Sequence, residues 1–248
     1  MTKWSAYNPI NDSPFLLSRS KIDLFSECPR CFYMDRRLSV KRPSMPGFSL
    51  NSAVDALLKN EFDLLRKDQK PHELMLMYKI DAIPYNHPDL SGWRDDAHNY
   101  VGASVLHQPT NLEVCGIVDD IWVKPNGELI IVDYKSTSTK DEISLEDKYK
   151  QGYKKQLELY QWIFRNKGFG VSNTGFFVYA NATKDRDRFD GRLEFEMQLI
   201  SYAGDDSWVE PKLFDIKKTL DSNEVPEPSA TCEYCSYVYK VENINQKL

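Results

Sequence analysis

Two apolar runs joined by the short segment KPNG constrain the fold more than any other feature of this sequence. The runs are LEVCGIVDDIWV at residues 112–123 and ELIIVDYK at residues 128–135. The proline suits the first central position of a type I turn, the asparagine suits the second, and the glycine suits the left-handed position that completes a bulged three-residue loop. The pattern therefore predicts a β-hairpin whose loop is closed by Lys124 and Glu128.

This loop would set which residues face one another across the hairpin. With Lys124 and Glu128 paired, Asp119 lies directly opposite Asp133, and their β-carbons are about 5 Å apart. Lys135 is two residues further along its strand, so it projects from the same face as Asp133. A two-residue loop would shift the register by one residue and separate the two acids, so the prediction depends on the type of turn.

The hairpin is expected to lie inside a larger sheet, because both of its strands are apolar on both faces. Such strands are usually covered by helices on both sides of a mixed sheet. A first helix is expected to start at Ser20, with Asp23 three positions on, and to be interrupted at Pro29. Further helices are predicted over residues 50–66, 144–167 and 206–222, and Gly168 would end the second of these. Further strands are predicted at 174–181 and 192–201.

These elements place the chain in the α/β class, with a mixed central β-sheet flanked by helices. Length and composition favour a single domain over residues 1–248. Within it we expect a mainly helical region at 18–107, a sheet and helix that carry the chemistry at 111–201, and a C-terminal helix at 202–248 that also bears a pair of cysteines.

Two opposed carboxylates are costly unless a positive charge lies between them, because they repel and one is pushed toward protonation. Mg²⁺ or Mn²⁺ would meet that need, since these ions take hard oxygen ligands and bridge to phosphate. Lys135 could orient a water or balance charge on transition-state oxygens. The alternative is an ion-paired surface patch without a catalytic role, but the apolar residues before Asp133 place that acid inside a sheet. Asp119, Asp133 and Lys135 thus form a candidate site for phosphodiester hydrolysis.

At these residues the sequence resembles the RecB-like branch of the PD-(D/E)XK nucleases, which includes the iron-sulfur exonucleases of CRISPR adaptation. GIVDD resembles the family's Gly-x-x-Asp motif, and IVDYK resembles its Asp-x-Lys motif. QLELY resembles its Gln-x-x-x-Tyr helix motif. The resemblance runs from about residue 18 to residue 236. It implies a restriction-endonuclease-like core, with Asp119, Asp133 and the backbone carbonyl of Tyr134 as metal ligands, and Gln156 and Tyr160 near the substrate strand.

One position departs from the family's pattern. Many relatives have a metal-binding histidine on the early helix, and the matching stretch SLNSAVDALL offers Asp55 instead. Aspartate is a competent hard ligand for Mg²⁺, although the departure puts the metal preference in doubt. As an isolated helix residue Asp55 would be an ordinary solvated acid.

Four cysteines form a second constellation. CPRC supplies Cys28 and Cys31, and CEYC supplies Cys232 and Cys235, so each pair can place two thiolates on one metal or cluster. A disulfide would not persist in a reducing cytoplasm. Relatives that hold a cluster usually supply one cysteine early and three late, so the resemblance implies [4Fe-4S], whereas a division of two and two also suits tetrahedral Zn²⁺. Either would clasp the C-terminus to the first helix.

Bulk composition narrows the functional classes. The formal net charge of −5 argues against a protein that coats nucleic acid, and no apolar run approaches the length of a membrane span. The N-terminus shows no secretory signal, which favours the cytoplasm. We expect a DNA exonuclease acting on single-stranded or frayed ends, with partners in DNA repair, recombination or CRISPR adaptation. The alternatives are a non-catalytic nucleic-acid-binding or assembly subunit that keeps the fold, and a redox sensor built on the cysteines.

Overall fold

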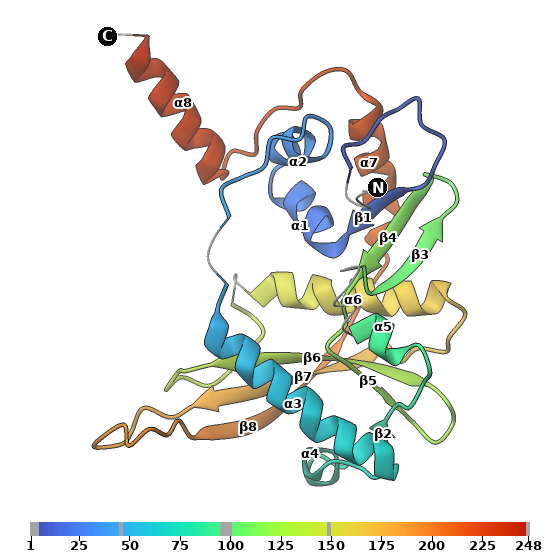
Figure 1. The fold of residues 1–248 in the computed structure, drawn as a ribbon, viewed down its shortest axis with the longest axis vertical. Coiled ribbons are helices and arrows are strands. Elements are labelled where there is room, and N and C mark those ends of the chain that lie inside the picture. The colour runs from blue at the N-terminus through green and yellow to red at the C-terminus, as the bar shows by residue number, and fades with distance from the viewer. Residues whose placement is uncertain (1–4, 45–46, 95–100, 148–149, 247–248) are drawn as a thin grey trace. The chain divides into compact units, whose positions relative to one another are not determined.

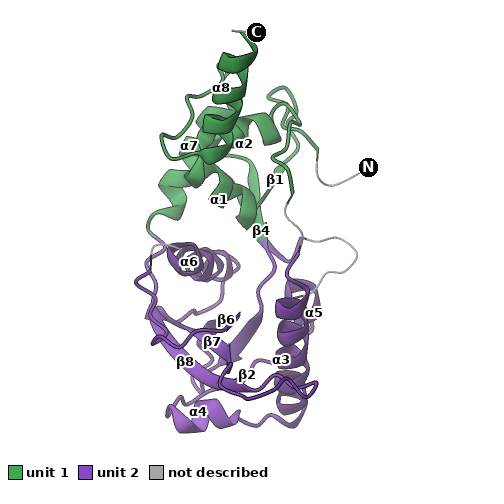
Figure 2. Cartoon of the chain, turned by 90° about the vertical axis from the view of Figure 1, so that its left-hand side faces the viewer, with its two compact units in different colours: residues 1–46, 104–115, 207–248 green, residues 47–103, 116–206 purple. Residues whose placement is uncertain are grey.

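The computed structural model describes residues 5–44, 47–94, 101–147 and 150–246. Its contacts divide the chain into two compact units (Figure 2). Unit 1 comprises Met1–Pro46, Ser104–Cys115 and Ser207–Leu248, and unit 2 comprises Gly47–Ala103 and Gly116–Asp206. That the chain forms one nuclease-like domain stays a prediction.

Unit 1 combines a small sheet with helices from both ends of the chain. The strands are ordered β1-β4-β3, and β1 runs parallel to β4. The last residue of β4 and the first of β3 belong to unit 2. The elements are β1 (Phe15–Ser18), α1 (Arg19–Glu27), α2 (Pro29–Arg36), β3 (Ala103–His107), β4 (Leu112–Gly116), α7 (Val209–Asp221) and α8 (Glu233–Asn245).

Unit 2 is built on a mixed sheet with the strand order β2-β5-β6-β7-β8, in which only β6 and β7 run parallel. Helix α6 is the crossover between these two strands (Figure 1). The elements are α3 (Ser49–Asp68), α4 (Glu73–Met77), β2 (Ile83–Pro84), α5 (Leu90–Arg94), β5 (Asp120–Val123), β6 (Leu129–Thr137), α6 (Gln151–Asn166), β7 (Thr174–Ala182) and β8 (Phe195–Ala203).

Helices cover both faces of this sheet. Phe62 of α3 and Met75 of α4 pack with Trp122, Val132 and other apolar residues that point to one face. On the opposite face α6 lies so close that a β-carbon added to Gly175 would come within 2.8 Å of the Leu157 side chain. The predicted fold class, a mixed sheet flanked by helices, is confirmed.

The hairpin loop forms as its sequence predicts. The backbone N–H of Lys124 donates to the Glu128 carbonyl over 3.0 Å, and the N–H of Gly127 donates to the Lys124 carbonyl over 2.9 Å. Gly127 has a φ of +84°, the left-handed conformation that this position requires. The resulting register pairs Asp120 with Val132 and Val123 with Leu129, so the predicted register is confirmed.

The prediction of one strand over 112–123 is wrong, because the structure divides it into β4 and β5 in different sheets. Between them the backbone finds partners outside either ladder. The N–H of Val118 donates to the Trp93 carbonyl over 3.1 Å, and the Ile117 carbonyl accepts a hydrogen bond from the Tyr160 hydroxyl over 2.6 Å. Periodicity alone could not reveal this break, since both halves are apolar.

Helix starts were the least accurate predictions. Helix α1 begins at Arg19, so Ser20 lies inside the helix and does not cap it. Helix α6 begins at Gln151 and not at 144, because the Ser144 hydroxyl accepts from the Glu146 N–H in a separate turn. Gly168, with a φ of +92°, follows the end of α6 as expected.

Helix α3 turns only some of its apolar residues toward the core. Leu58 and Phe62 are buried and Val54 packs against the core, whereas Leu57 is 67% exposed. The later elements, β7, β8 and α7, lie within about three residues of their predicted bounds. Among the described residues, no helix is both long and apolar enough to cross a bilayer.

A buried charge network ties the hairpin to α3 and α5 on the face away from Asp119 and Asp133. Asp120 is fully buried and forms ion pairs with Arg66 and, at 3.6 Å, with Arg94. It also accepts a hydrogen bond from the Tyr134 hydroxyl over 2.7 Å. Asp63 contacts both arginines, so the network holds two cations and two carboxylates.

Replacing Asp120 should therefore destabilise the protein strongly. We expect Asp120→Ala to lower the free energy of unfolding by about 3–5 kcal/mol, because it removes the fully buried carboxylate and leaves the two arginines with Asp63 as their remaining carboxylate partner. Urea denaturation followed by circular dichroism measures this. Asp81→Ala, at an exposed aspartate of the same unit, should stay within about 0.5 kcal/mol of wild type. A loss below about 1 kcal/mol for Asp120→Ala would contradict the proposed strength of the network.

Candidate active site

The hairpin brings the two predicted acids to neighbouring positions in unit 2. Asp119 directly precedes β5, and continuing the register of β5 and β6 by one residue places it opposite Asp133. The backbone N–H of Tyr134 donates to the Asp119 carboxylate over 2.8 Å, which fixes that side chain against β6. The juxtaposition of Asp119 and Asp133 follows from the turn geometry.

Asp133 is a buried carboxylate with few partners to offset its charge. It is fully buried and forms an ion pair with Lys135. Lys135 contacts one of its oxygens, Oδ2, whereas the other, Oδ1, has no partner among the residues that the structure describes. Buried charges are normally paired and hydrogen-bonded, so an oxygen in this condition suits a cation that is bound from outside the chain.

The pKa of Asp119 is raised because its carboxyl is buried close to the negative charge of Asp133. Burial and the neighbouring Asp133 raise its pKa to about 7, although Lys135 and Lys59 act in the opposite direction. At neutral pH the carboxyl is therefore held close to the point where it gains or loses a proton. A divalent cation would favour the charged form of both acids.

Lys135 provides the positive charge in the cluster. Its side chain is only 14% exposed, and its ammonium lies 4.6 Å from the centre of the Tyr153 ring. Burial alone would lower the pKa of Lys135, but Asp133 and Asp119 more than offset this and raise it. The lysine therefore stays charged at neutral pH.

Asp55 lies near the other two acids but is held differently. It sits on α3, half-buried, with its carboxylate 2.9 Å from the ammonium of Lys59. Burial raises the pKa of Asp55, and electrostatic repulsion from the Asp119 carboxylate raises it further. Lys59 was not predicted, although its position four residues after Asp55 on a helix was a usable signal.

The residues of the Gln-x-x-x-Tyr motif share one face of α6. Tyr160 is buried, and its hydroxyl bonds to the Ile117 carbonyl, two residues before Asp119. Gln156 lies one turn earlier on the helix and is half-buried. The structure thus gives Tyr160 a place in supporting the segment that carries Asp119. A role for either residue at the substrate stays a prediction.

Tyr134 divides its groups between the two faces of the sheet. Its side chain points into the buried charge network through the bond to Asp120. Its backbone carbonyl, the predicted metal ligand, lies 3.4 Å from the ammonium of Lys135. This tyrosine therefore links the candidate site to the charge network beneath it, which was not predicted from the sequence.

The donor set fits a hard divalent cation. Asp55, Asp119, Asp133 and the Tyr134 carbonyl offer oxygen ligands, which Mg²⁺ and Mn²⁺ prefer. The buried Oδ1 of Asp133, which has no partner among the described residues, is the observation that favours such an ion. The three carboxylates are not gathered as tightly as a completed ion site would hold them: of the described His, Cys, Asp and Glu side chains, only the four cysteines place three or more ligand atoms within 4.8 Å of one another.

Those four cysteines form a compact group in unit 1. The sulfur of Cys31 lies 3.6 Å from that of Cys232 and 3.5 Å from that of Cys235, and Cys28 lies 3.8 Å from Cys235. None of them is in a disulfide. Burial would raise the pKa of Cys28, but the backbone N–H groups of Cys31 and Ser229 help lower it to about 6. The predicted approach of the two CxxC pairs is confirmed.

The sulfur separations bear on which metal they would hold. With Zn–S bonds of about 2.3 Å, a tetrahedral zinc site has sulfurs about 3.8 Å apart, close to the spacing seen here. Arg42 donates a hydrogen bond from its guanidinium to the Cys232 sulfur over 3.5 Å and offsets part of the thiolate charge. Cys115 is buried apart from this group.

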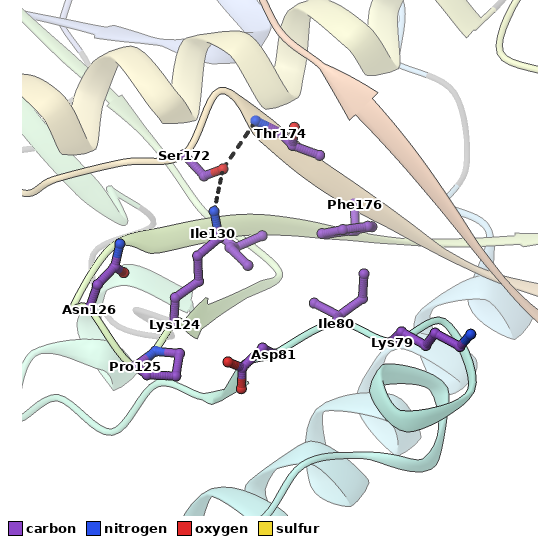
Figure 3. Close-up of a pocket in the computed structure, with 10 residues that line it drawn as sticks. All are labelled: Lys79, Ile80, Asp81, Lys124, Pro125, Asn126, Ile130, Ser172, Thr174 and Phe176. Atoms are coloured by element: carbon purple, nitrogen blue, oxygen red, sulfur yellow. Dashed lines mark hydrogen bonds between the residues drawn. The ribbon is translucent and has the colours of Figure 1, made fainter.

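A hollow of about 500 Å³ lies at the loop end of the hairpin (Figure 3). Lys124 reaches the Ser172 hydroxyl there over 3.3 Å, and the same hydroxyl accepts from the Thr174 N–H. None of the candidate acids lines it. The candidate chemistry lies further along the same strands, away from this hollow.

Comparison with known proteins bears on the whole chain. A family model described as the PD-(D/E)XK nuclease superfamily matches residues 16–238. The crystal structure of SSO0001 aligns over 90% of this chain and 84% of that one, with 16% sequence identity. Its TM-score of 0.40 is too low to support an argument about the fold. No curated protein sequence matches. The match over nearly the full length, together with the acids that the hairpin brings together, shows that the chain belongs to the PD-(D/E)XK nuclease superfamily.

Proposed function

We propose that this protein is a Mg²⁺- or Mn²⁺-dependent deoxyribonuclease that hydrolyses phosphodiester bonds with Asp119, Asp133 and Lys135. The observation that carries the proposal is the buried Asp133 carboxylate, which lies across the hairpin from Asp119 and whose Oδ1 has no partner among the described residues, while Lys135 contacts its Oδ2. Membership of a nuclease superfamily supports it.

Four groups would hold the cation, namely the carboxylates of Asp55, Asp119 and Asp133 and the carbonyl of Tyr134. When bound, Mg²⁺ or Mn²⁺ polarises the phosphoryl group and lowers the pKa of a coordinated water. Lys59 pairs with one oxygen of Asp55 at 2.9 Å, so a bound cation would share this carboxylate with the lysine or compete with it.

Lys135 is suited to charge stabilisation and to holding the attacking water. Its ammonium is buried, stays protonated and is oriented by Asp133 on one side and the Tyr153 ring on the other. A preorganised cation of this kind stabilises negative charge that develops on phosphoryl oxygens. Gln156 would contact the substrate strand, and Tyr160 would hold the Asp119 segment in place.

The family resemblance supports more specific proposals about the substrate, the mode of cleavage and the partner proteins. It favours DNA, single-stranded or frayed ends, exonuclease action and partner proteins in DNA repair, recombination or CRISPR adaptation. A cytoplasmic location also belongs to the proposal.

A non-catalytic nucleic-acid-binding or assembly subunit is the second candidate. The observation that favours it is the pairing of Asp55 with Lys59, where many relatives have a metal-binding histidine. DNA binding that survives without divalent metal, with no cleavage of any substrate, would select this alternative.

We further propose that Cys28, Cys31, Cys232 and Cys235 hold a structural metal centre. The resemblance favours [4Fe-4S], whereas the sulfur separations of 3.5–3.8 Å match a zinc tetrahedron. Each would join the start of α2 to the start of α8.

Removing the Asp133 carboxylate should abolish cleavage. Purified protein is expected to degrade labelled linear single-stranded DNA with Mn²⁺ or Mg²⁺ and to stop with EDTA. Asp133→Asn should lower the rate by at least about 10²-fold, because it removes a metal ligand that supports transition-state charge. Asp141→Asn, at an exposed aspartate of the same unit, is the matched control and should cleave normally. Equal rates for Asp133→Asn and wild type would rule out the assignment, and cutting of circular strands would exclude a strictly end-dependent enzyme.

The raised pKa of Asp119 predicts that removing its charge stabilises the metal-free protein and weakens metal binding. At pH 8 without divalent metal the buried carboxylate is charged and unfavourable, so Asp119→Asn should raise the Tm by about 2–4 °C, or about 1 kcal/mol. At pH 5 the carboxyl of the folded wild type is protonated, because its pKa is about 7, so the difference should be smaller, and it should vanish only below about pH 4, where the unfolded carboxyl is protonated as well. Mn²⁺ should stabilise wild type and have little effect on the variant. A metal-free variant less stable than wild type at pH 8 contradicts this account.

Metal analysis after anaerobic purification tests the cysteine site. About one zinc per chain in a colourless protein selects zinc, and about four irons with a brown colour select the cluster. Cys31→Ser should lose the metal, whereas Cys115→Ala should retain it because Cys115 lies outside the group. Wild-type protein with neither metal would overturn the proposal.

A further inference from the structure

Tyr179 carries a buried hydroxyl that the roles assigned above do not use. It lies on β7 directly beside Lys135 of β6 in the parallel register. The residue is only 2% exposed. Its hydroxyl has no hydrogen-bond partner among the residues that the structure describes.

Such a group needs a physical explanation. A buried polar atom without a partner is unfavourable, and phenylalanine would fill the same space without that cost. Orphaned hydroxyls of this kind are uncommon and mark positions where a ligand or water completes the bonding.

The surroundings of Tyr179 point to the candidate active site. Burial raises its pKa, and the nearby Tyr153, Asp133 and Asp147 raise it further. Tyr153 is the ring that packs against Lys135. The phenol therefore stays protonated at neutral pH and acts as a donor, not as a base.

A donor, the Tyr179 hydroxyl, and one acceptor atom, the Asp133 Oδ1, both lack partners among the described residues of this region. The Tyr179 hydroxyl and the Asp133 carboxylate influence each other, yet neither is hydrogen-bonded to the other. An oxygen ligand that accepts from the phenol, while a cation links it to the carboxylate, would satisfy both groups. A phosphate has oxygens of this kind.

We propose that Tyr179 is a substrate-contacting residue whose O–H donates a hydrogen bond to a non-bridging oxygen of the scissile phosphate. The inference rests on the proposed nuclease function and extends it by one residue. Lys135, its neighbour in the register, would contact the same phosphoryl group from the adjacent strand.

The test is Tyr179→Phe, which removes one oxygen and keeps the ring. We expect an unchanged or slightly raised Tm and an unchanged Mn²⁺ affinity by calorimetry without DNA. The kcat/KM on linear single-stranded DNA should fall by about 10–100-fold, the range for a hydrogen bond to a charged group. The combination of intact stability and lost activity is what a purely structural tyrosine would not produce.

Tyr202→Phe is the matched control. The Tyr202 hydroxyl is bonded to Glu158, so its removal should lower the Tm and leave kcat/KM unchanged. The two substitutions delete the same atom from neighbouring strands and are expected to have opposite effects.

Three results would overturn the inference while wild type cleaves DNA. They are a Tyr179→Phe variant as active as wild type, a Tm loss that accounts for the lost activity, and a weakened Mn²⁺ affinity without DNA, which would assign the hydroxyl to the metal's water and not to the phosphate. A wild-type protein that cleaves no DNA would instead remove the proposed function, and this inference with it.

Discussion

The register of the β5–β6 hairpin is the constraint on which the candidate site depends. A three-residue loop, with Gly127 in a left-handed conformation, fixes which residues of the two strands face each other. Because side chains alternate along a strand, a slip of one residue would send Asp133 to the opposite face and place Tyr134 where the carboxylate now lies. A local turn thus determines whether two acids can share one cation.

The same alternation gives two adjacent aspartates different roles. Asp119 faces Asp133 and Lys135, whereas Asp120 is buried on the other face, between two arginines and the Tyr134 hydroxyl. The charges around Asp120 are satisfied, and the charges around Asp119 are not. The satisfied network anchors both strands of the hairpin and leaves the other face free to hold groups that are unfavourable without a bound ion.

Those unfavourable groups distinguish a candidate site from a structural ion-pair cluster. Asp133 and Tyr179 are buried with unpartnered polar atoms, and the Asp119 pKa is raised to about 7. Proteins lose stability by burying such groups, and a metal ion with a phosphate would recover it through binding. The cysteine group of unit 1 already holds its four sulfurs close together, so the two candidate metal sites differ in how far the chain organises them.

Local sequence patterns were enough to predict the hairpin, its register, the opposition of Asp119 to Asp133 and the approach of the CxxC segments. These follow from turn chemistry and short-range periodicity, which act between residues close in the chain, and from cysteine spacing. Packing between distant segments accounts for the division of residues 112–123 between two sheets, the pairing of Lys59 with Asp55 and the position of Tyr179 beside Lys135. The division of the strand depends on a hydrogen bond to the Trp93 carbonyl and one from the Tyr160 hydroxyl, and the position of Tyr179 depends on a parallel pairing across a helical crossover. Neither leaves a local pattern in the sequence, because parallel register is fixed by packing between distant segments and not by a turn.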